Sequence, residues 1–149
     1  AVVYALLERG IDRVAVANRT ASRAAALHER FGARVDPVAW DERDAALDDA
    51  TLLVNTTTLG MDGQPELRLK VGRLPGHAVV ADLVYVPRDT HLLRTARARQ
   101  LRTADGLGML MHQAVGGFQL WFGKRPEVTA QLRALLEADL AAPHPSASE

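Results

Sequence analysis

The sequence predicts an α/β fold, in which a doubly wound parallel sheet has helices on both faces and is closed by C-terminal helices. Short, nearly all-apolar runs alternate along the 149 residues with longer runs of helical periodicity. Strands buried on both faces have such continuous apolar runs, and alternation with helices is typical of parallel sheets. No repeat or linker divides the chain, so we expect one domain over residues 1–140.

The first part of the chain begins with a helix over residues 1–10 that Gly10 ends. No capping residue precedes this helix, so we expect upstream residues to be missing. The pattern then predicts a strand over 12–18, a helix over 20–31, a brief strand within 33–40 that Pro37 cuts short, a short capped helix over 41–49 and a buried strand over 51–57.

Glycine and proline are frequent in residues 58–77, which we expect to form a loop. Asp105 is expected to cap the long helix that follows it, and the Gly116–Gly117 pair is expected to weaken that helix. The remaining elements are a buried strand over 78–85, a helix from about Thr90, an edge strand over 101–106, the long helix over 108–123, a last helix from about Pro126 to Leu140 and a disordered tail over 141–149.

The composition argues against several classes of function. Lys plus Arg and Asp plus Glu balance at 18 each, so bulk charge gives no reason to expect a nucleic-acid or membrane partner. The chain has no cysteine, and its five histidines are scattered, so we expect neither disulfides nor a metal site. No signal peptide or membrane-spanning run is visible, and we expect a cytoplasmic protein.

The end of the strand at residues 12–18 carries the first functional pattern. Arg19 and Arg23 lie four residues apart around the start of a helix, close to Asn18 and Thr20, and no carboxylate lies among them. At this position in a dinucleotide-binding fold, an acidic residue binds the ribose 2′-hydroxyl of NAD, whereas arginine accommodates the 2′-phosphate of NADP. The pattern favours NADP; the alternative is a capped helix with two solvated arginines.

Four segments together resemble a known family. "ANRTASR", "VNTTTLGM", "ADLVY" and "DGLGMLMHQAVGGFQLWFG" are similar to the C-terminal, NADP-binding half of shikimate dehydrogenases, and the resemblance covers nearly the whole chain. It implies a Rossmann-like domain whose glycine-rich loop would precede Ala1. "ANRT" also resembles glutamyl-tRNA reductases, but the "DGLGMLMHQ" segment, Tyr85 and the lack of basic excess disfavour that family.

The resemblance assigns roles to individual residues. The adenosine 2′-phosphate would be held by Asn18, Arg19, Thr20 and Arg23. The rest of the cofactor would meet Asn55 and Thr57 in a trough, an apolar wall at Leu83 and closely approaching backbone at Gly106. Thr56 stands where the family commonly has alanine, which leaves a backbone role open. Tyr85 and Gln113 would contact the substrate.

The implied activity is that of an oxidoreductase of aromatic amino-acid biosynthesis, the reversible NADPH-dependent reduction of 3-dehydroshikimate to shikimate. The family's catalytic Lys–Asp pair belongs to an N-terminal substrate domain, and neither Lys70 nor Lys124 lies in a matching motif, so we assign no catalytic residue here. The chain alone is expected to be inactive, and a homodimer is compatible with the resemblance. The alternatives are a quinate/shikimate dehydrogenase and a non-catalytic nucleotide-binding module.

Overall fold

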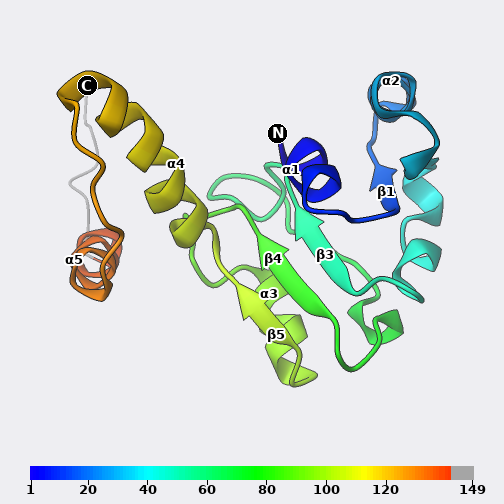
Figure 1. Cartoon of the computed structure of the whole chain (residues 1–149). Helices are drawn as coiled ribbons and strands as arrows, with labels where there is room; N and C mark the ends of the chain where they lie inside the picture. Colours follow the sequence, from blue (N-terminus) through cyan, green and yellow to red (C-terminus); the bar gives the residue numbers. More distant parts are fainter. Residues whose placement is uncertain (142–149) are drawn as a thin grey trace, which may run out of the picture. The chain divides into compact units, whose positions relative to one another are not determined.

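The computed structural model describes residues 1–141, which form parallel sheets flanked by helices (Figure 1). The predicted α/β fold is therefore confirmed. Two compact units divide these residues, one comprising 1–51 and 69–75 and the other 52–68 and 76 onward. The elements are α1 (Val2–Glu8), β1 (Val14–Ala17), α2 (Ala21–Phe31), β2 (Val35–Val38), β3 (Leu52–Asn55), β4 (Val79–Asp82), α3 (His91–Ala98), β5 (Arg102–Ala104), α4 (Gly106–Phe122) and α5 (Ala130–Ala141), with 3-10 turns at Gly32–Arg34, Trp40–Glu42, Ala45–Leu47 and Val71–Arg73.

The first unit contains a two-stranded parallel sheet. β1 pairs with β2 from Val14 opposite Val35 to Ala17 opposite Val38. The helix α2 connects the two strands and packs on both of them. Ala24 of α2 and Val35 of β2 are buried. This β1–α2–β2 arrangement places the start of α2 directly after the carboxyl end of β1.

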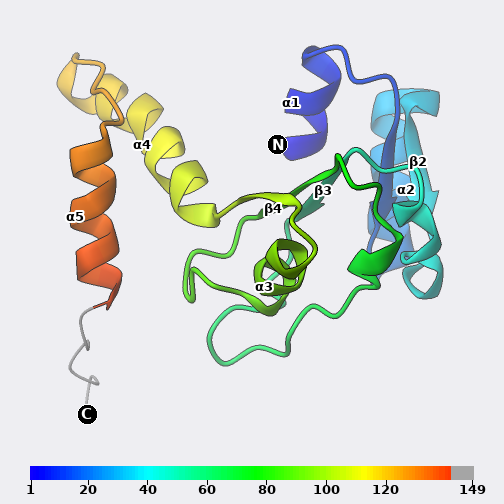
Figure 2. The same cartoon turned by 90° about the horizontal axis from the view of Figure 1, so that it is seen from below.

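The second unit contains a three-stranded parallel sheet in the order β3-β4-β5, which Figure 1 shows as three arrows side by side. α3 connects β4 to β5 and packs on both of these strands (Figure 2). Leu92 and Leu93 of α3 are buried together with Val80 of β4. Because the strands are parallel, the carboxyl ends of β3 and β4 lie next to each other, with Asn55 paired to Asp82.

The C-terminal helices α4 and α5 pack on each other and complete the second unit. Leu107, Met111 and Val115 of α4 are buried. Apolar side chains at the end of α4 are exposed, with Leu120 at 86% and Trp121 at 81%. None of the helices within residues 1–141 combines the length and the apolar character that crossing a membrane requires.

Three predicted boundaries were wrong. Pro37 does not end its strand but lies within β2, where it stands opposite Val16; β2 has a strand neighbour on one side only, and an edge strand tolerates a residue without an N–H. Residues 41–49 form 3-10 turns instead of a helix, because Asp44 and Asp48 bind distant partners, the Lys70 N–H and the Arg73 guanidinium.

The last helix begins at Ala130 instead of Pro126, because the Thr129 hydroxyl accepts a hydrogen bond from the Leu132 N–H (3.1 Å) at its start. The Gly116–Gly117 pair does not interrupt α4. The tail expected over 141–149 lies outside the described residues, apart from Ala141, the last residue of α5.

Candidate functional site

The junction between β1 and α2 carries two guanidinium groups that have no partner among the described residues. Thr20 is the N-cap residue of α2, yet its side chain makes no capping hydrogen bond; the Asn18 side-chain oxygen instead accepts from the Thr20 N–H at 2.9 Å. Arg19 and Arg23 are exposed, and neither guanidinium makes a hydrogen bond or ion pair to any other described residue. The structure thus brings the four predicted phosphate-binding residues to one short segment.

An anion is the ligand that such a segment suits. The first N–H groups of a helix lack intrahelical partners, and the helix dipole favours negative charge near them. α2 has no acidic residue in its first turn that would already supply this charge. Arg19 just before the N-cap residue and Arg23 in the first turn of α2 are two guanidinium groups that could donate charge-assisted hydrogen bonds to a phosphate there.

At the carboxyl ends of β3 and β4, in the second unit, the polar side chains are hydrogen-bonded to other groups of the protein. The Asn55 side chain is only 3% exposed, and its amide donates to Leu59 O (3.1 Å) and to the Asp82 carboxylate (2.9 Å). Its side-chain oxygen accepts from the N–H and the hydroxyl of Thr57, at 3.0 and 2.8 Å. Two donors and two acceptor sites are all that an asparagine side chain has. The Asn55 side chain therefore has no hydrogen-bonding group left over for a cofactor.

Asp82 is the hub of these contacts. It is 1% exposed, and its carboxylate accepts from Asn55, from the Val84 N–H (3.1 Å) and from the Thr90 hydroxyl (2.7 Å). Thr90 in turn caps α3 by accepting from the Leu93 N–H. We call Asn55, Thr57, Asp82 and Thr90 the Asp82 network. Its donors satisfy a buried carboxylate, which would otherwise be costly.

Gly106, the first residue of α4, lies against the backbone that follows β4. A Cβ atom placed on it would be 2.5 Å from Val84 O and closer still to Leu83 O. No side chain fits in that space, so the glycine permits close packing between the start of α4 and residues 83–84. The structure thus gives Gly106 a packing role within the protein.

Tyr85 and Gln113, the two predicted substrate-binding residues, have different surroundings. Tyr85 is half-buried and lines a pocket of about 370 Å³ together with Asp62, Pro87, Arg88 and Glu137. Gln113 is exposed on α4 and is not among the residues that line this pocket. Within the described residues, the structure therefore does not bring the two side chains to one pocket.

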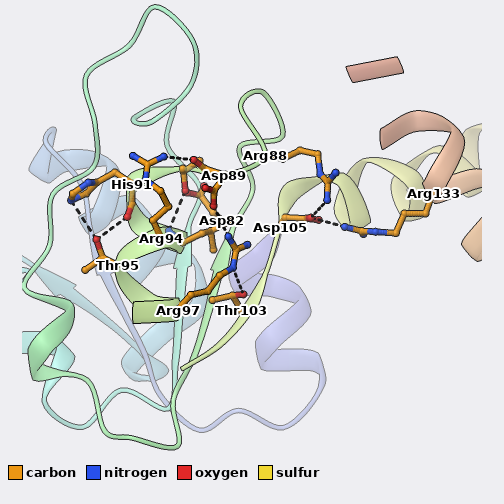
Figure 3. Close-up of polar contacts among 12 residues, drawn as sticks. Asp82, Arg88, Asp89, His91, Arg94, Thr95, Arg97, Thr103, Asp105 and Arg133 are labelled. Carbon is orange, nitrogen blue, oxygen red and sulfur yellow. Dashed lines mark hydrogen bonds and ion pairs between the residues drawn. The ribbon is translucent and has the colours of Figure 1, made fainter. Parts of the chain in front are cut away.

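A cluster of alternating charges includes Arg88 and Glu137 of this pocket, and Figure 3 shows its Arg88, Asp105 and Arg133 side chains. Asp105, the N-cap residue of α4, accepts from Arg133 of α5 (2.5 Å) and faces Arg88 at 3.4 Å. Glu137 pairs with the same two arginines, at 2.9 and 2.8 Å. Burial raises the pKa of Asp105, but the hydrogen bond and charge of Arg133, the backbone N–H of Gly108 and the charge of Arg88 outweigh it and lower the pKa below its ordinary value.

Asp105 was predicted to cap α4. It occupies the N-cap position, and the backbone N–H of Gly108 in the first turn acts on its carboxylate, but the hydrogen bond that its side chain forms is the one from Arg133. Sequence reasoning placed Asp82 at a strand end but assigned no role to it, to Thr90 or to the arginines around Asp105. A charged residue that ends an apolar run, as Asp82 does in "VVADLVY", is the pattern that could have revealed the buried hub. No group of three or more potential metal ligands lies close together among residues 1–141.

Comparison with known proteins connects these features to one family. The model of the shikimate 5′-dehydrogenase C-terminal domain matches residues 106–136. A curated shikimate dehydrogenase (NADP(+)) from Rhodopseudomonas palustris strain BisB5 is 67% identical over 142 residues, which are 95% of this chain and 50% of the relative. The chain spans about half the length of the curated relatives it matches.

Solved structures show the same likeness. Shikimate 5-dehydrogenase from Thermus thermophilus, in complex with NADP(H) and shikimate, is 36% identical with a TM-score of 0.76, over 92% of this chain and 50% of that one. Quinate dehydrogenase from Corynebacterium glutamicum, in complex with NAD, is 34% identical with a TM-score of 0.80, over 91% and 50%. Over 95% of its length, the chain is therefore similar to one half of an NADP-dependent shikimate dehydrogenase.

Proposed function

We propose that this chain is the NADP-binding part of a shikimate dehydrogenase that reversibly reduces 3-dehydroshikimate to shikimate in aromatic amino-acid biosynthesis. The observation that carries the proposal is the pair of unpartnered guanidinium groups, Arg19 and Arg23, at the start of α2. The names of the relatives support it, since they are NADP-dependent shikimate dehydrogenases.

The residues present fit the cofactor. Arg19 and Arg23, with Asn18 and Thr20 beside them, would hold the 2′-phosphate, and the uncommitted N–H groups at the start of α2 add to the attraction. The half-buried Leu83 would offer an apolar surface to the nicotinamide end, and the backbone around Asn55, Thr57 and Gly106 would border it. When bound, the cofactor supplies the hydride, while the protein orients the two reactants.

Tyr85 and Gln113 would contact the substrate, as the family resemblance implies. Tyr85 lines the pocket beside Asp105, which supports its part of this assignment. The proton for the reaction would come from the N-terminal substrate domain of the complete protein, since this chain offers no group that we assign to that step. We also propose that the complete protein works in the cytoplasm. A homodimer is compatible with the family resemblance, and light scattering would measure the oligomeric state.

Steady-state kinetics of the complete protein test the proposal. We expect shikimate-dependent reduction of NADP⁺, with NADP⁺ preferred over NAD⁺. Each charge-assisted hydrogen bond contributes about 1.5–3 kcal/mol, so Arg19→Ala should raise the KM for NADP⁺ by about tenfold to a hundredfold. The KM for shikimate and for NAD⁺ should change little.

Arg34→Ala is a matched control, because Arg34 is an exposed arginine in the turn that follows α2 instead of the one that precedes it. It should leave all three constants unchanged. A preference for NAD⁺ in the unmodified protein, or an equal effect of Arg19→Ala on the KM for shikimate, would contradict the proposed role of the two arginines.

Quinate oxidation is the second candidate, because one of the similar structures is a quinate dehydrogenase bound to NAD. The absence of a carboxylate from the start of α2 favours the NADP-dependent alternative. Comparing kcat/KM for quinate with NAD⁺ against shikimate with NADP⁺ on the same preparation distinguishes the two functions.

A further inference from the structure

We propose that Asn55 and Asp82 are positioning residues that fasten the loop after β3 (residues 56–62) to the segment after β4 (residues 83–86), so that the two move as one unit. The functional part of this inference rests on the proposed dehydrogenase function. The loop after β3 would border the cofactor, and the segment after β4 carries Tyr85.

The side-chain bridge is the first part of the evidence. Asn55 and Asp82 stand opposite each other at the last paired position of β3 and β4, and the Asn55 amide donates to the Asp82 carboxylate at 2.9 Å. From this bridge one branch runs into each segment. Asn55 holds Leu59 and Thr57 of the first loop, while Asp82 holds the Val84 N–H of the second segment.

Backbone contacts continue the connection beyond the bridge. Leu83 N–H donates to Asn55 O (3.0 Å), and Asp62 N–H donates to Val86 O (3.1 Å). The two segments are therefore connected at their beginnings and again several residues later. A displacement of one segment must move the other or break these hydrogen bonds.

The burial of the bridge makes it expensive to open. Both side chains are enclosed, and all four hydrogen-bonding positions of Asn55 are used within the protein. A buried donor or acceptor that loses its partner is not compensated by water. Neither side chain is free to bind a ligand, so their effect on catalysis would be to hold the neighbouring segments in place.

Thr90 supplies a matched control, because it binds the other carboxylate oxygen of Asp82 and belongs to α3. Thr90→Val removes this hydrogen bond and the cap of α3. The methyl group of Thr90 lies near Gly60 in the loop after β3, since a Cβ atom placed on Gly60 would be 3.7 Å from it. Valine keeps this methyl group. The variant should therefore lower stability without disconnecting the two segments.

The test measures hydrogen exchange and kinetics on the complete protein. Asp82→Ala should speed amide exchange in both 56–62 and 83–86 by about tenfold to a hundredfold. It should also raise the KM for NADP⁺ and for shikimate together. Asp82→Asn keeps an oxygen for Asn55 and Val84, and its amide can donate to the Thr90 hydroxyl, so it should restore most of both properties. Thr90→Val should speed exchange at the start of α3 while both KM values stay unchanged.

Several outcomes would overturn the inference: faster exchange in only one of the two segments, or unchanged KM values in Asp82→Ala, or the same KM changes in Thr90→Val. If Asp82→Ala does not fold, Asn55→Ala opens the same bridge and should give the same pattern. The exchange measurement needs no activity. If the unmodified protein fails to reduce NADP⁺ with shikimate, the proposed function fails, and exchange alone still decides whether the segments are coupled.

Discussion

The β1–α2 junction and the Asp82 network both follow the carboxyl ends of parallel strands, but their polar groups are used in opposite ways. At the junction, the guanidinium groups of Arg19 and Arg23 have no partner within residues 1–141. In the network, Asn55 and Asp82 are buried and saturated by other protein groups. Free groups at a strand end are available for a ligand, whereas saturated groups can only hold the backbone that meets it.

The comparison predicts that changes near the network act on stability and that changes at the junction act on binding. The largest effect is expected at Gly106, next to the segment that the network holds. Gly106→Ala places a methyl group 2.5 Å from Val84 O, so either α4 or residues 83–84 must shift. Overpacking usually costs about 1–3 kcal/mol, and we expect about 3 kcal/mol or more here, because the atoms that the methyl group meets are backbone atoms of residues 83–84.

Denaturant unfolding of the complete protein measures this effect. Gly108→Ala is the control from the same motif, since a Cβ atom there would meet only the end of the Arg133 side chain, at 3.8 Å. That variant should be neutral or stabilising, because alanine favours the helix interior by about 1 kcal/mol over glycine. Equal losses of unfolding free energy in the two variants would show that close packing against residues 83–84 is not the reason for glycine at position 106.

The second prediction concerns Asp105, whose carboxylate lies between Arg88 and Arg133. Asp105→Asn should lower the free energy of unfolding by about 1.5–3 kcal/mol at neutral pH, the range for hydrogen bonds to charged groups. The folded-state pKa of Asp105 lies below its ordinary value of 3.8, so its contribution is fully present above that value. It is lost as the pH falls through the folded-state pKa.

Unfolding experiments at a series of pH values check this sign. The stability difference between the unmodified protein and Asp105→Asn should be constant near neutral pH and shrink below about pH 4. A difference that persists unchanged into strong acid would show that the aspartate stabilises α4 by packing and not by its charge.

The sequence was sufficient for the parts of this comparison that depend on local patterns. Apolar runs predicted β3 and β4, and the position of Arg19 and Arg23 after β1 followed from the strand's end, because these are properties of neighbouring residues. The bridge between Asn55 and Asp82 could not be predicted in the same way. The two residues are 27 positions apart, and their contact depends on the register in which β3 pairs with β4.

The same reasoning explains two of the regions where prediction failed. Asp44 and Asp48 look like residues of a capped helix, but long-range partners, the Lys70 N–H and Arg73, take their carboxylates. Asp105 looks like a helix cap, but its carboxylate accepts a hydrogen bond from Arg133 of α5. Short polar segments have little local preference, so tertiary contacts decide their structure.

The third prediction returns to the β1–α2 junction. Asn18→Asp keeps a side-chain oxygen for the Thr20 N–H, so the unfolding transition should not move. The added negative charge should repel a 2′-phosphate and favour a ribose hydroxyl, which raises the KM for NADP⁺ by about tenfold and lowers that for NAD⁺. A stability loss without a change in cofactor preference would show that Asn18, like Asn55 and Asp82, stabilises the backbone and does not select the cofactor.

The smallest effect is expected for an exposed ion pair of the first unit. Arg13, just before β1, donates to the Asp36 carboxylate of β2 at 3.1 Å from its Nε atom, and both side chains are largely exposed. Solvent screens such a pair, and the two long side chains lose freedom when they meet. Arg13→Ala should therefore leave both the denaturation midpoint and the KM for NADP⁺ within experimental error. A clear loss of stability would mean that this exposed ion pair holds β1 against β2. Polar contacts within the protein would then stabilise the first unit as they do the second.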